Sequence, residues 1–186
     1  MSNQRKIGRR AFLASTAAAI AGANTAFARR GRHSANETVN VGLIGLGGRC
    51  TRLASSYLPI GGMRVVAVCD CFKPRVDTFV SKVGKGLNLK GYTDFREMIE
   101  KENLDGVMIE TTTHARAWVT CHAMAMEMDA YIEKPMCLSV AEGRHMVETA
   151  RKYKRVTQVG TQQRSIPLNN WASDLVQNGA IGKIRV

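Results

Sequence analysis

From Thr38 onward, short apolar runs rich in β-branched residues alternate strictly with longer segments of helical periodicity. Near-continuous apolar runs are typical of strands that are buried on both faces of a parallel sheet. Because parallel strands joined by helices need right-handed crossovers, the pattern predicts a doubly wound α/β fold with a parallel sheet. The expected strands are Val39–Gly45, Met63–Asp70, Leu104–Thr111, Ala130–Glu133 and Val156–Gly160, and the expected helices cover about 48–58, 72–84, 94–102, 114–128 and 139–154.

The end of the chain indicates the beginning of a second domain. Pro167 suits the first turn of a helix and Asn178 its last, so Pro167–Gln177 is predicted to be a further helix. Lys183–Val186 then has the composition of a new strand. Since this helix and strand lack a second layer to cover them, we expect residues 164–186 to be the start of a truncated domain.

The first 28 residues have the three regions of a secretory signal peptide. A basic start precedes an uncharged run, Ala11–Ala28, which ends in the cleavage site Ala26-Phe27-Ala28. Arg9 and Arg10 stand before Ala11-Phe12-Leu13, which resembles the twin-arginine export signal. We therefore expect a twin-arginine-type signal peptide over 1–28, a linker over 29–37 and a periplasmic destination. Few large apolar side chains occur in the run, so no stable membrane span is expected after cleavage.

Basic residues outnumber acidic ones, but their positions do not indicate a nucleic-acid partner. The sequence has 27 Lys and Arg against 15 Asp and Glu, a formal net charge of +12. Part of the excess lies near the N-terminus, and Arg151–Arg155 ends a predicted helix, where cations complement the helix dipole. No recognition motif or interleaved aromatic residue accompanies these charges. The five cysteines lack a paired Cys-x-x-Cys spacing, so no metal site is expected.

A glycine-rich turn joins the first predicted strand to the first predicted helix. Gly45 suits a tight turn, and Gly47 lets the backbone approach a pyrophosphate. The helix that begins near Gly48 and Arg49 presents amides and a positive dipole to the phosphates. Cys50 stands where the dinucleotide-binding fingerprint has its third glycine, so we expect a slight shift of the helix and not a loss of binding.

An acid ends the second predicted strand, 25 residues after Gly45. Asp70 can accept hydrogen bonds from the adenosine ribose hydroxyls, and its charge disfavours a 2′-phosphate. Lys73 and Arg75 lie close enough in sequence to soften that preference. The predicted cofactor is therefore NAD, with NADP as the alternative.

A second group of polar residues follows the strand predicted at 130–133. The carboxyl ends of the strands of an open α/β sheet are where ligands bind, and Glu133-Lys134-Pro135 lies at such an end. Lys134 there can hydrogen-bond a substrate hydroxyl and help to move a proton. A surface ion pair between a Lys and an adjacent Glu is the alternative interpretation.

In this order, Gly45–Gly48, Asp70, Glu133-Lys134-Pro135 and Gln158–Arg164 resemble the Gfo/Idh/MocA oxidoreductases, named for glucose-fructose oxidoreductase and inositol dehydrogenase. The resemblance covers about residues 38–186. It implies an NAD(P)-binding Rossmann domain over 38–163, followed by an α+β open-sheet domain that completes a sugar or cyclitol pocket. It also implies that Lys134 lies near the nicotinamide and the substrate, and that Glu133 belongs to the cofactor site.

The loop after the fourth strand departs from the family pattern. That loop usually reads Thr-Pro-Asp/Asn-x-x-His, whereas this sequence has Thr111-Thr112-Thr113-His114-Ala115-Arg116. Thr111 matches and is assigned to the cofactor site. The resemblance makes His114 a candidate to face the nicotinamide, and a surface histidine at a helix start is the alternative. Arg116 replaces the final His and is expected to add a cation near the pocket.

These residues predict an NAD(P)-dependent oxidoreductase that transfers a hydride between the nicotinamide and a sugar, polyol or cyclitol alcohol, with Lys134 and His114 as catalytic candidates. Relatives resembling this protein also use the cofactor to cleave glycosides, which is one alternative. A nucleotide-binding remnant without catalysis is another, because the general acid/base of the family lies in the second domain. The expected partner is a small carbohydrate or polyol, and exposed strand edges make a homo-oligomer an option.

Overall fold

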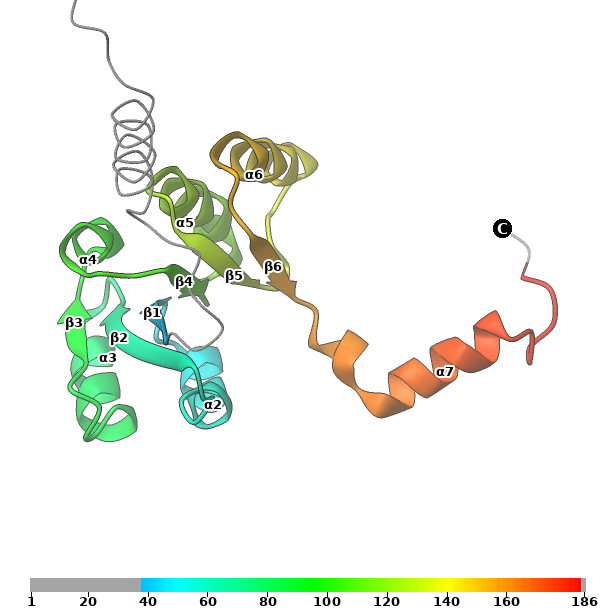
Figure 1. The fold of residues 1–186 in the computed structure, drawn as a ribbon, viewed down its shortest axis with the longest axis horizontal. Coiled ribbons are helices and arrows are strands. Elements are labelled where there is room, and N and C mark those ends of the chain that lie inside the picture. The colour runs from blue at the N-terminus through cyan, green and yellow to red at the C-terminus, as the bar shows by residue number, and fades with distance from the viewer. Residues whose placement is uncertain (1–37, 185–186) are drawn as a thin grey trace, which may run out of the picture. The chain divides into compact units, whose positions relative to one another are not determined.

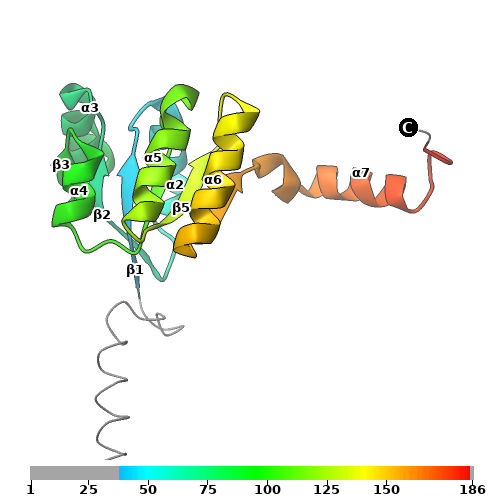
Figure 2. The ribbon, with the colours of Figure 1, turned by 90° about the horizontal axis from the view of Figure 1, so that it is seen from above.

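The computed structural model describes residues 38–184, which contain a six-stranded sheet with helices on both faces (Figures 1 and 2). The strand order is β3-β2-β1-β4-β5-β6, and every neighbouring pair is parallel. The strands are β1 (Val39–Ile44), β2 (Met63–Cys69), β3 (Lys90–Tyr92), β4 (Gly106–Ile109), β5 (Asp129–Glu133) and β6 (Thr157–Gly160). The predicted doubly wound α/β fold is therefore confirmed. The predicted signal peptide and linker lie outside the described residues.

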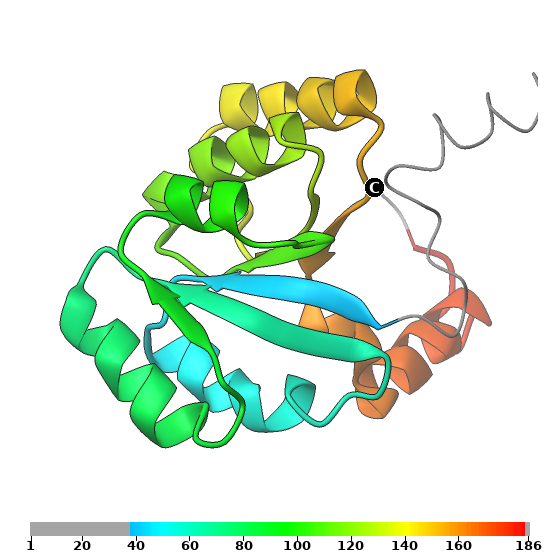
Figure 3. The ribbon, with the colours of Figure 1, turned by 60° about the vertical axis from the view of Figure 1, so that its left-hand side comes forward.

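The helices divide between the two faces of the sheet. In Figure 3, α2 and α3 lie on one face, and α4, α5 and α6 lie on the other. The helices are α2 (Gly48–Tyr57), α3 (Lys73–Thr78), the π-helical turn η1 (Phe79–Val83), α4 (Phe95–Lys101), α5 (Thr113–Ala125), α6 (Val140–Tyr153), the 3-10 turn η2 (Gln162–Ser165) and α7 (Pro167–Gln177).

Each face of the sheet has its own apolar core. Leu43 and Val68 pack with buried residues of α2 and α3, whereas Val107 and Ile109 pack with α4 and α5. Burial on both faces explains why the strands appear in the sequence as continuous apolar runs and not as alternating ones.

Two features of the fold differ from the expectations. The edge strand β3 (Lys90–Tyr92) was not predicted, because three residues with a central glycine carry no recognisable strand pattern. The single helix expected over 72–84 is α3 followed by the turn η1. The other predicted strands and helices are present, with bounds that move by at most three residues.

Helix α7 has the predicted bounds, but none of its residues is buried. Its large apolar side chains are exposed, with Leu168 at 67% and Trp171 at 59%. The strand expected from Lys183 is not formed at Lys183 and Ile184, and the remainder of that segment lies outside the described residues. Within residues 38–184, no helix is both long and apolar enough to cross a bilayer.

Candidate functional site

The turn after β1 has room only for glycine at its first position, Gly45. Gly45 has φ +92, and a Cβ built on it would lie 2.7 Å from the amide nitrogen of Thr111 and 2.8 Å from the carbonyl carbon of Glu110. Backbone hydrogen bonds hold the neighbouring strands there, from Gly45 N to Cys69 O and from Glu110 N to Ile44 O, both 2.8 Å. The turn therefore sits against the end of β4, and a side chain at Gly45 would collide with backbone atoms.

The start of helix α2 offers the geometry that a phosphate needs. Gly47 is the N-cap residue, and no side chain caps the helix. A Cβ on Gly47 or Gly48 would meet nothing within 4 Å, so the space beside the first amides is open. Uncapped amides and the positive end of the helix dipole attract anions. These residues fit a dinucleotide pyrophosphate, as the sequence predicts.

Asp70 connects the end of β2 to the glycine turn. Its Oδ2 accepts a hydrogen bond from Leu46 N at 2.8 Å, and its Oδ1 accepts one from Phe72 N at 2.9 Å. The side chain is 6% exposed, and the guanidinium of Arg75 lies 3.7 Å from Oδ2. An ionised carboxylate can accept about four hydrogen bonds, so Asp70 retains capacity for a ligand hydroxyl.

The two cations near Asp70 are not equivalent. Lys73 Nζ donates to both carboxylate oxygens of Asp77 at 2.7 Å, on the surface of α3. Arg75 instead lies over the exposed ring of Phe72, 5.7 Å from its centroid, and beside Asp70. Of the two, Arg75 contacts the carboxylate of Asp70, whereas Lys73 is paired with Asp77.

Cys50 shows how the helix accommodates the missing third glycine. The residue is fully buried, and its Sγ lies 3.2 Å from the hydroxyl of Tyr57. That hydroxyl also donates to the carbonyl of Cys50, at 3.2 Å. Burial raises the pKa of the Cys50 thiol to about 12, so it stays neutral and acts as a packing residue.

Glu133 ties β5 to the first turn of α2. The Nε and Nη2 atoms of Arg49 donate to Oε1 of Glu133 at 2.9 and 2.7 Å. Oε2 accepts from the backbone nitrogen of Lys134 at 3.1 Å. Glu133 is 2% exposed, and its hydrogen bonds raise the pKa of Arg49. Both residues belong to the predicted cofactor site, and the structure joins them although they lie 84 positions apart.

A further buried acid, Glu110, was missed by the sequence analysis. It directly follows β4 and is 6% exposed, and neither of its carboxylate oxygens has a hydrogen-bond partner among the described residues. Burial, followed by the charge of Glu133, raises the pKa of Glu110 to about 7. The only signal in the sequence is an acid directly after the apolar run Val107–Ile109, which also fits an ordinary strand end.

Arg116, expected to add a cation near the pocket, is held in place by hydrogen bonds to two loops. It is 8% exposed, its Nε donates to Thr111 O at 2.9 Å, and its Nη1 donates to Pro135 O at 2.6 Å. Burial lowers the pKa of the guanidinium. Arg116 therefore links the loop after β4 to the loop after β5, because both carbonyls accept from one side chain.

The two catalytic candidates lie at the same edge of the sheet, and both are exposed. Lys134 follows β5 and forms a cis peptide bond with Pro135. His114 lies in the first turn of α5, with its Nδ1 3.1 Å from the hydroxyl of Thr112. Thr111, which precedes this helix, has a buried hydroxyl without a hydrogen-bond partner in the described part of the chain.

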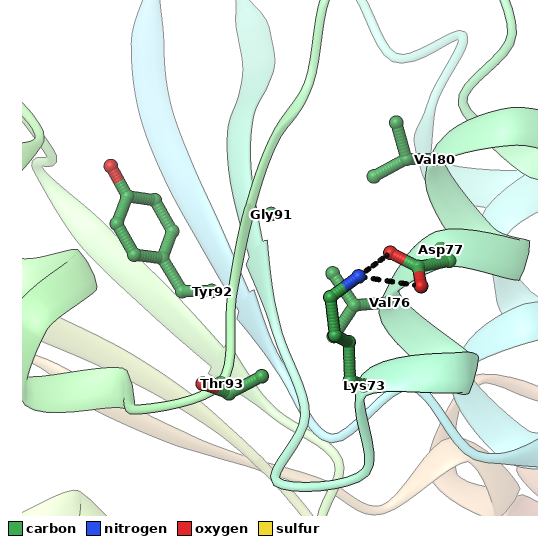
Figure 4. A pocket seen from close by; sticks show the side chains of 7 residues that line it. All are labelled: Lys73, Val76, Asp77, Val80, Gly91, Tyr92 and Thr93. Atoms are coloured by element: carbon green, nitrogen blue, oxygen red, sulfur yellow. Dashed lines mark hydrogen bonds and ion pairs between the residues drawn. The ribbon is translucent and has the colours of Figure 1, made fainter.

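A separate groove of about 340 Å³ lies between α3 and the edge strand β3 (Figure 4). The Lys73–Asp77 pair stands at its side, and Tyr92 lines it and accepts through its carbonyl from Asp70 N at 3.2 Å. The groove was not predicted, and it lies on the side of Asp70 away from β1, since β2 is between them. Within residues 38–184, no group of three or more His, Cys, Asp or Glu could hold a metal ion.

These features together define a dinucleotide-binding domain: a parallel sheet in this strand order, a glycine turn, an uncapped helix start and an acid after β2. The family model of the Gfo/Idh/MocA oxidoreductases, described as an oxidoreductase family with an NAD-binding Rossmann fold, matches residues 39–161. The chain belongs to this family, as the resemblance in its motifs indicates. The predicted cofactor, NAD, agrees with the family.

The chain spans less than half the length of the relatives that it matches. Inositol 2-dehydrogenase from Salmonella paratyphi B is 26% identical over 151 residues, which are 78% of this chain and 44% of the relative. Glycosyl hydrolase family 109 protein 1 from Akkermansia muciniphila is 27% identical over 125 residues, 64% of this chain and 26% of the relative. The crystal structure of myo-inositol 2-dehydrogenase from Lactobacillus plantarum has a TM-score of 0.72 and 27% identity, covering 80% of this chain and 43% of that one.

Proposed function

We propose that the chain is the cofactor-binding part of an oxidoreductase that transfers a hydride between NAD and a polyol or cyclitol alcohol. The observation that carries this proposal is the group of residues at the carboxyl ends of β1 and β2. There, a turn with room only for glycine at Gly45 and the uncapped start of α2 meet the buried carboxylate of Asp70. The inositol dehydrogenases among the relatives support a cyclitol or related polyol as the substrate class.

In this function the bound nicotinamide supplies the hydride acceptor, and the protein binds the cofactor and orients the substrate. The amides at the start of α2 hold the phosphates, and Asp70 accepts from the ribose hydroxyls. Lys134 and His114, at the neighbouring loop ends, are placed to meet a substrate hydroxyl. Arg116 keeps the two loops that carry them at a fixed separation, since it binds a carbonyl of each.

The test is a titration of the purified chain with NADH, followed by energy transfer from protein to nicotinamide fluorescence. Binding should be saturable, and it should be lost in Gly47→Trp, which fills the open space beside the helix start. Asp70→Ala should weaken binding strongly, because it removes the ribose acceptor and releases the amide of Leu46. Glu148→Gln, on the exposed face of α6, is the matched control and should bind normally. A folded chain that binds no NADH would refute the proposal.

A glycoside-cleaving use of the same cofactor is the second candidate, and the matching glycosyl hydrolase family 109 protein favours it. The two functions share the NADH site and differ in the product. Incubation of the full-length protein with a polyol panel and a panel of aryl glycosides separates them. Net NADH formation supports the dehydrogenase, and release of the aryl alcohol without net NADH supports glycoside cleavage. Bound NADH with neither product supports the non-catalytic alternative.

We further propose that the protein is exported to the periplasm by the twin-arginine route and that residues from 164 onward begin the substrate domain. The pair Arg9-Arg10 before Ala11-Phe12-Leu13 supports export, and the exposed apolar side chains of α7 support an uncovered domain start. A fusion of residues 1–37 to a reporter that is active only after export should be active. Arg9→Lys with Arg10→Lys should abolish that activity.

A further inference from the structure

Glu110 is a buried acid that the proposed function does not use. It lies at the end of β4, directly against the turn that contains Gly45, and both of its carboxylate oxygens are buried without a hydrogen-bond partner among the described residues. A carboxylate in this position would be a buried charge without a hydrogen bond, whereas a neutral carboxyl group costs much less. A buried acid without a hydrogen bond, next to the glycine turn, therefore needs an explanation.

The charges of Arg49 and Arg116 favour an ionised Glu110, but neither guanidinium hydrogen-bonds its carboxylate. Arg49 gives its Nε and Nη2 hydrogen bonds to Glu133, and Arg116 gives its own to the carbonyls of Thr111 and Pro135. Glu133 is a second buried carboxylate and repels a charge on Glu110. The titratable and charged groups that act on Glu110 or feel its charge are Arg49, Cys50 and Tyr57 of α2, Tyr131 and Glu133 of β5, and Arg116 of α5.

Three of these groups belong to α2, the helix whose start faces the phosphates. Arg49 lies in its first turn, and Cys50 follows at the position where the helix packs on the sheet. The helix start attracts the phosphates through its amides and dipole, and a negative charge beneath it opposes that attraction. An ionised Glu110 and a bound pyrophosphate therefore disfavour each other, because both are anions next to the same helix turn.

We propose that Glu110 is the proton-binding residue of the dinucleotide site, so that NADH binds to the form with a protonated Glu110 and binding draws a proton to this residue. The inference rests on the proposed function. It assigns to Glu110 a positioning role through α2 and not a contact with the cofactor. The affinity for NADH should then fall as the pH rises through neutrality, where Glu110 ionises.

The experiment compares NADH dissociation constants at about pH 6 and about pH 8.5 in the unmodified protein, in Glu110→Gln and in Glu148→Gln. The unmodified protein and the Glu148→Gln control should bind about tenfold more weakly at the higher pH. Glu110→Gln keeps the size and hydrogen-bonding groups of the acid without its charge, so its affinity should change by less than about twofold. Calorimetry of NADH binding near neutral pH, in buffers of different ionisation enthalpy, should show proton uptake that Glu110→Gln lacks.

The outcomes separate this inference from the proposed function. Equal pH dependence in the unmodified protein and in Glu110→Gln overturns the coupling and leaves the NADH site intact. Binding that is independent of pH in the unmodified protein also overturns it. If the folded chain binds no NADH at either pH, the proposed function fails and the coupling fails with it. His114, an exposed histidine at the same edge of the sheet, is present in all three proteins, so it cannot produce the expected difference.

Discussion

The two sides of the dinucleotide site differ in the groups that form them. The side formed by β1, α2 and β2 works through the backbone: a positive φ at Gly45, open space at Gly47 and uncapped amides. The side formed by the ends of β4 and β5 works through buried charged side chains, above all Glu110 and Glu133. The first side is specified by residues close together in the chain. The second depends on contacts between residues far apart, so the two sides should respond to different kinds of change.

The backbone side should show the largest effect of a single substitution. Gly45→Val places a branched side chain at φ +92, where a Cβ alone would lie 2.7 Å from the backbone nitrogen of Thr111. Strain at positive φ and the clash with backbone together should cost about 4 kcal/mol of unfolding free energy or more. Gly48→Ala, where a Cβ meets nothing within 4 Å, is the matched control and should change stability by less than about 1 kcal/mol. Urea denaturation measures both, and similar losses in the two variants would contradict a backbone role specific to Gly45.

The charged side should show the largest dependence on pH. The pKa of Glu110 is about 7 in the folded chain against its ordinary value of 4.5. Below about pH 4.5 the carboxyl is protonated in both the folded and the unfolded states, and no stability is lost. As the pH rises towards 7, only the unfolded state ionises, so the folded state loses stability, by about 3 kcal/mol in total.

Glu110→Gln removes this loss. The difference in unfolding free energy between Glu110→Gln and the unmodified protein should therefore grow in favour of the variant by about 3 kcal/mol between about pH 4.5 and about pH 8. Urea denaturation across that range measures it. Glu148→Gln, which alters an exposed carboxylate of α6, should show no comparable trend. A constant difference at every pH would show that Glu110 is not kept protonated by its surroundings.

The ion pair between the two sides should have an intermediate effect. Glu133→Ala leaves the guanidinium of Arg49 without its partner, but that side chain is 36% exposed and can turn to water. We expect a loss of about 2 kcal/mol, below the range for fully buried pairs. Arg49→Met leaves the more deeply buried carboxylate of Glu133 without its ion-pair partner, so the loss of unfolding free energy should be at least as large. A double-mutant cycle with both changes gives the coupling energy, and a value near zero would mean that the two sides of the site are held together by other contacts.

The same contrast explains how much could be predicted from the sequence. The fold was predictable because β1, β2 and β4 are mostly apolar runs that are followed by helices, a pattern that is complete within about 30 residues. The three-residue strand β3 carries no such pattern. It forms because parallel pairing with β2, from Ala67 to Cys69, supplies its hydrogen bonds.

In the candidate site, the glycines and Asp70 were predictable because their spacing along the chain reports their geometry directly. The pairing of Arg49 with Glu133 was not, since it joins residues 84 positions apart. Glu110 could not be distinguished from an acid at an ordinary strand end, because its burial is a property of the folded chain. The partners of Arg116 were not predictable for the same reason: only the fold shows that carbonyls of two loops accept from its guanidinium.

The smallest effect concerns the choice between NAD and NADP. It tests how much side chains contribute on the side of the site where the backbone does most of the binding. Lys73 is engaged by Asp77, and Arg75 lies 3.7 Å from the carboxylate of Asp70. Arg75→Met should weaken NADPH binding about fivefold, because an exposed cation next to a phosphate is worth about 1 kcal/mol. Lys73→Met should change it by less than about twofold, and neither variant should change NADH binding by more than that. Fluorescence titrations with both nucleotides measure these values, and a larger effect of Lys73→Met would show that its pair with Asp77 opens when the nucleotide binds.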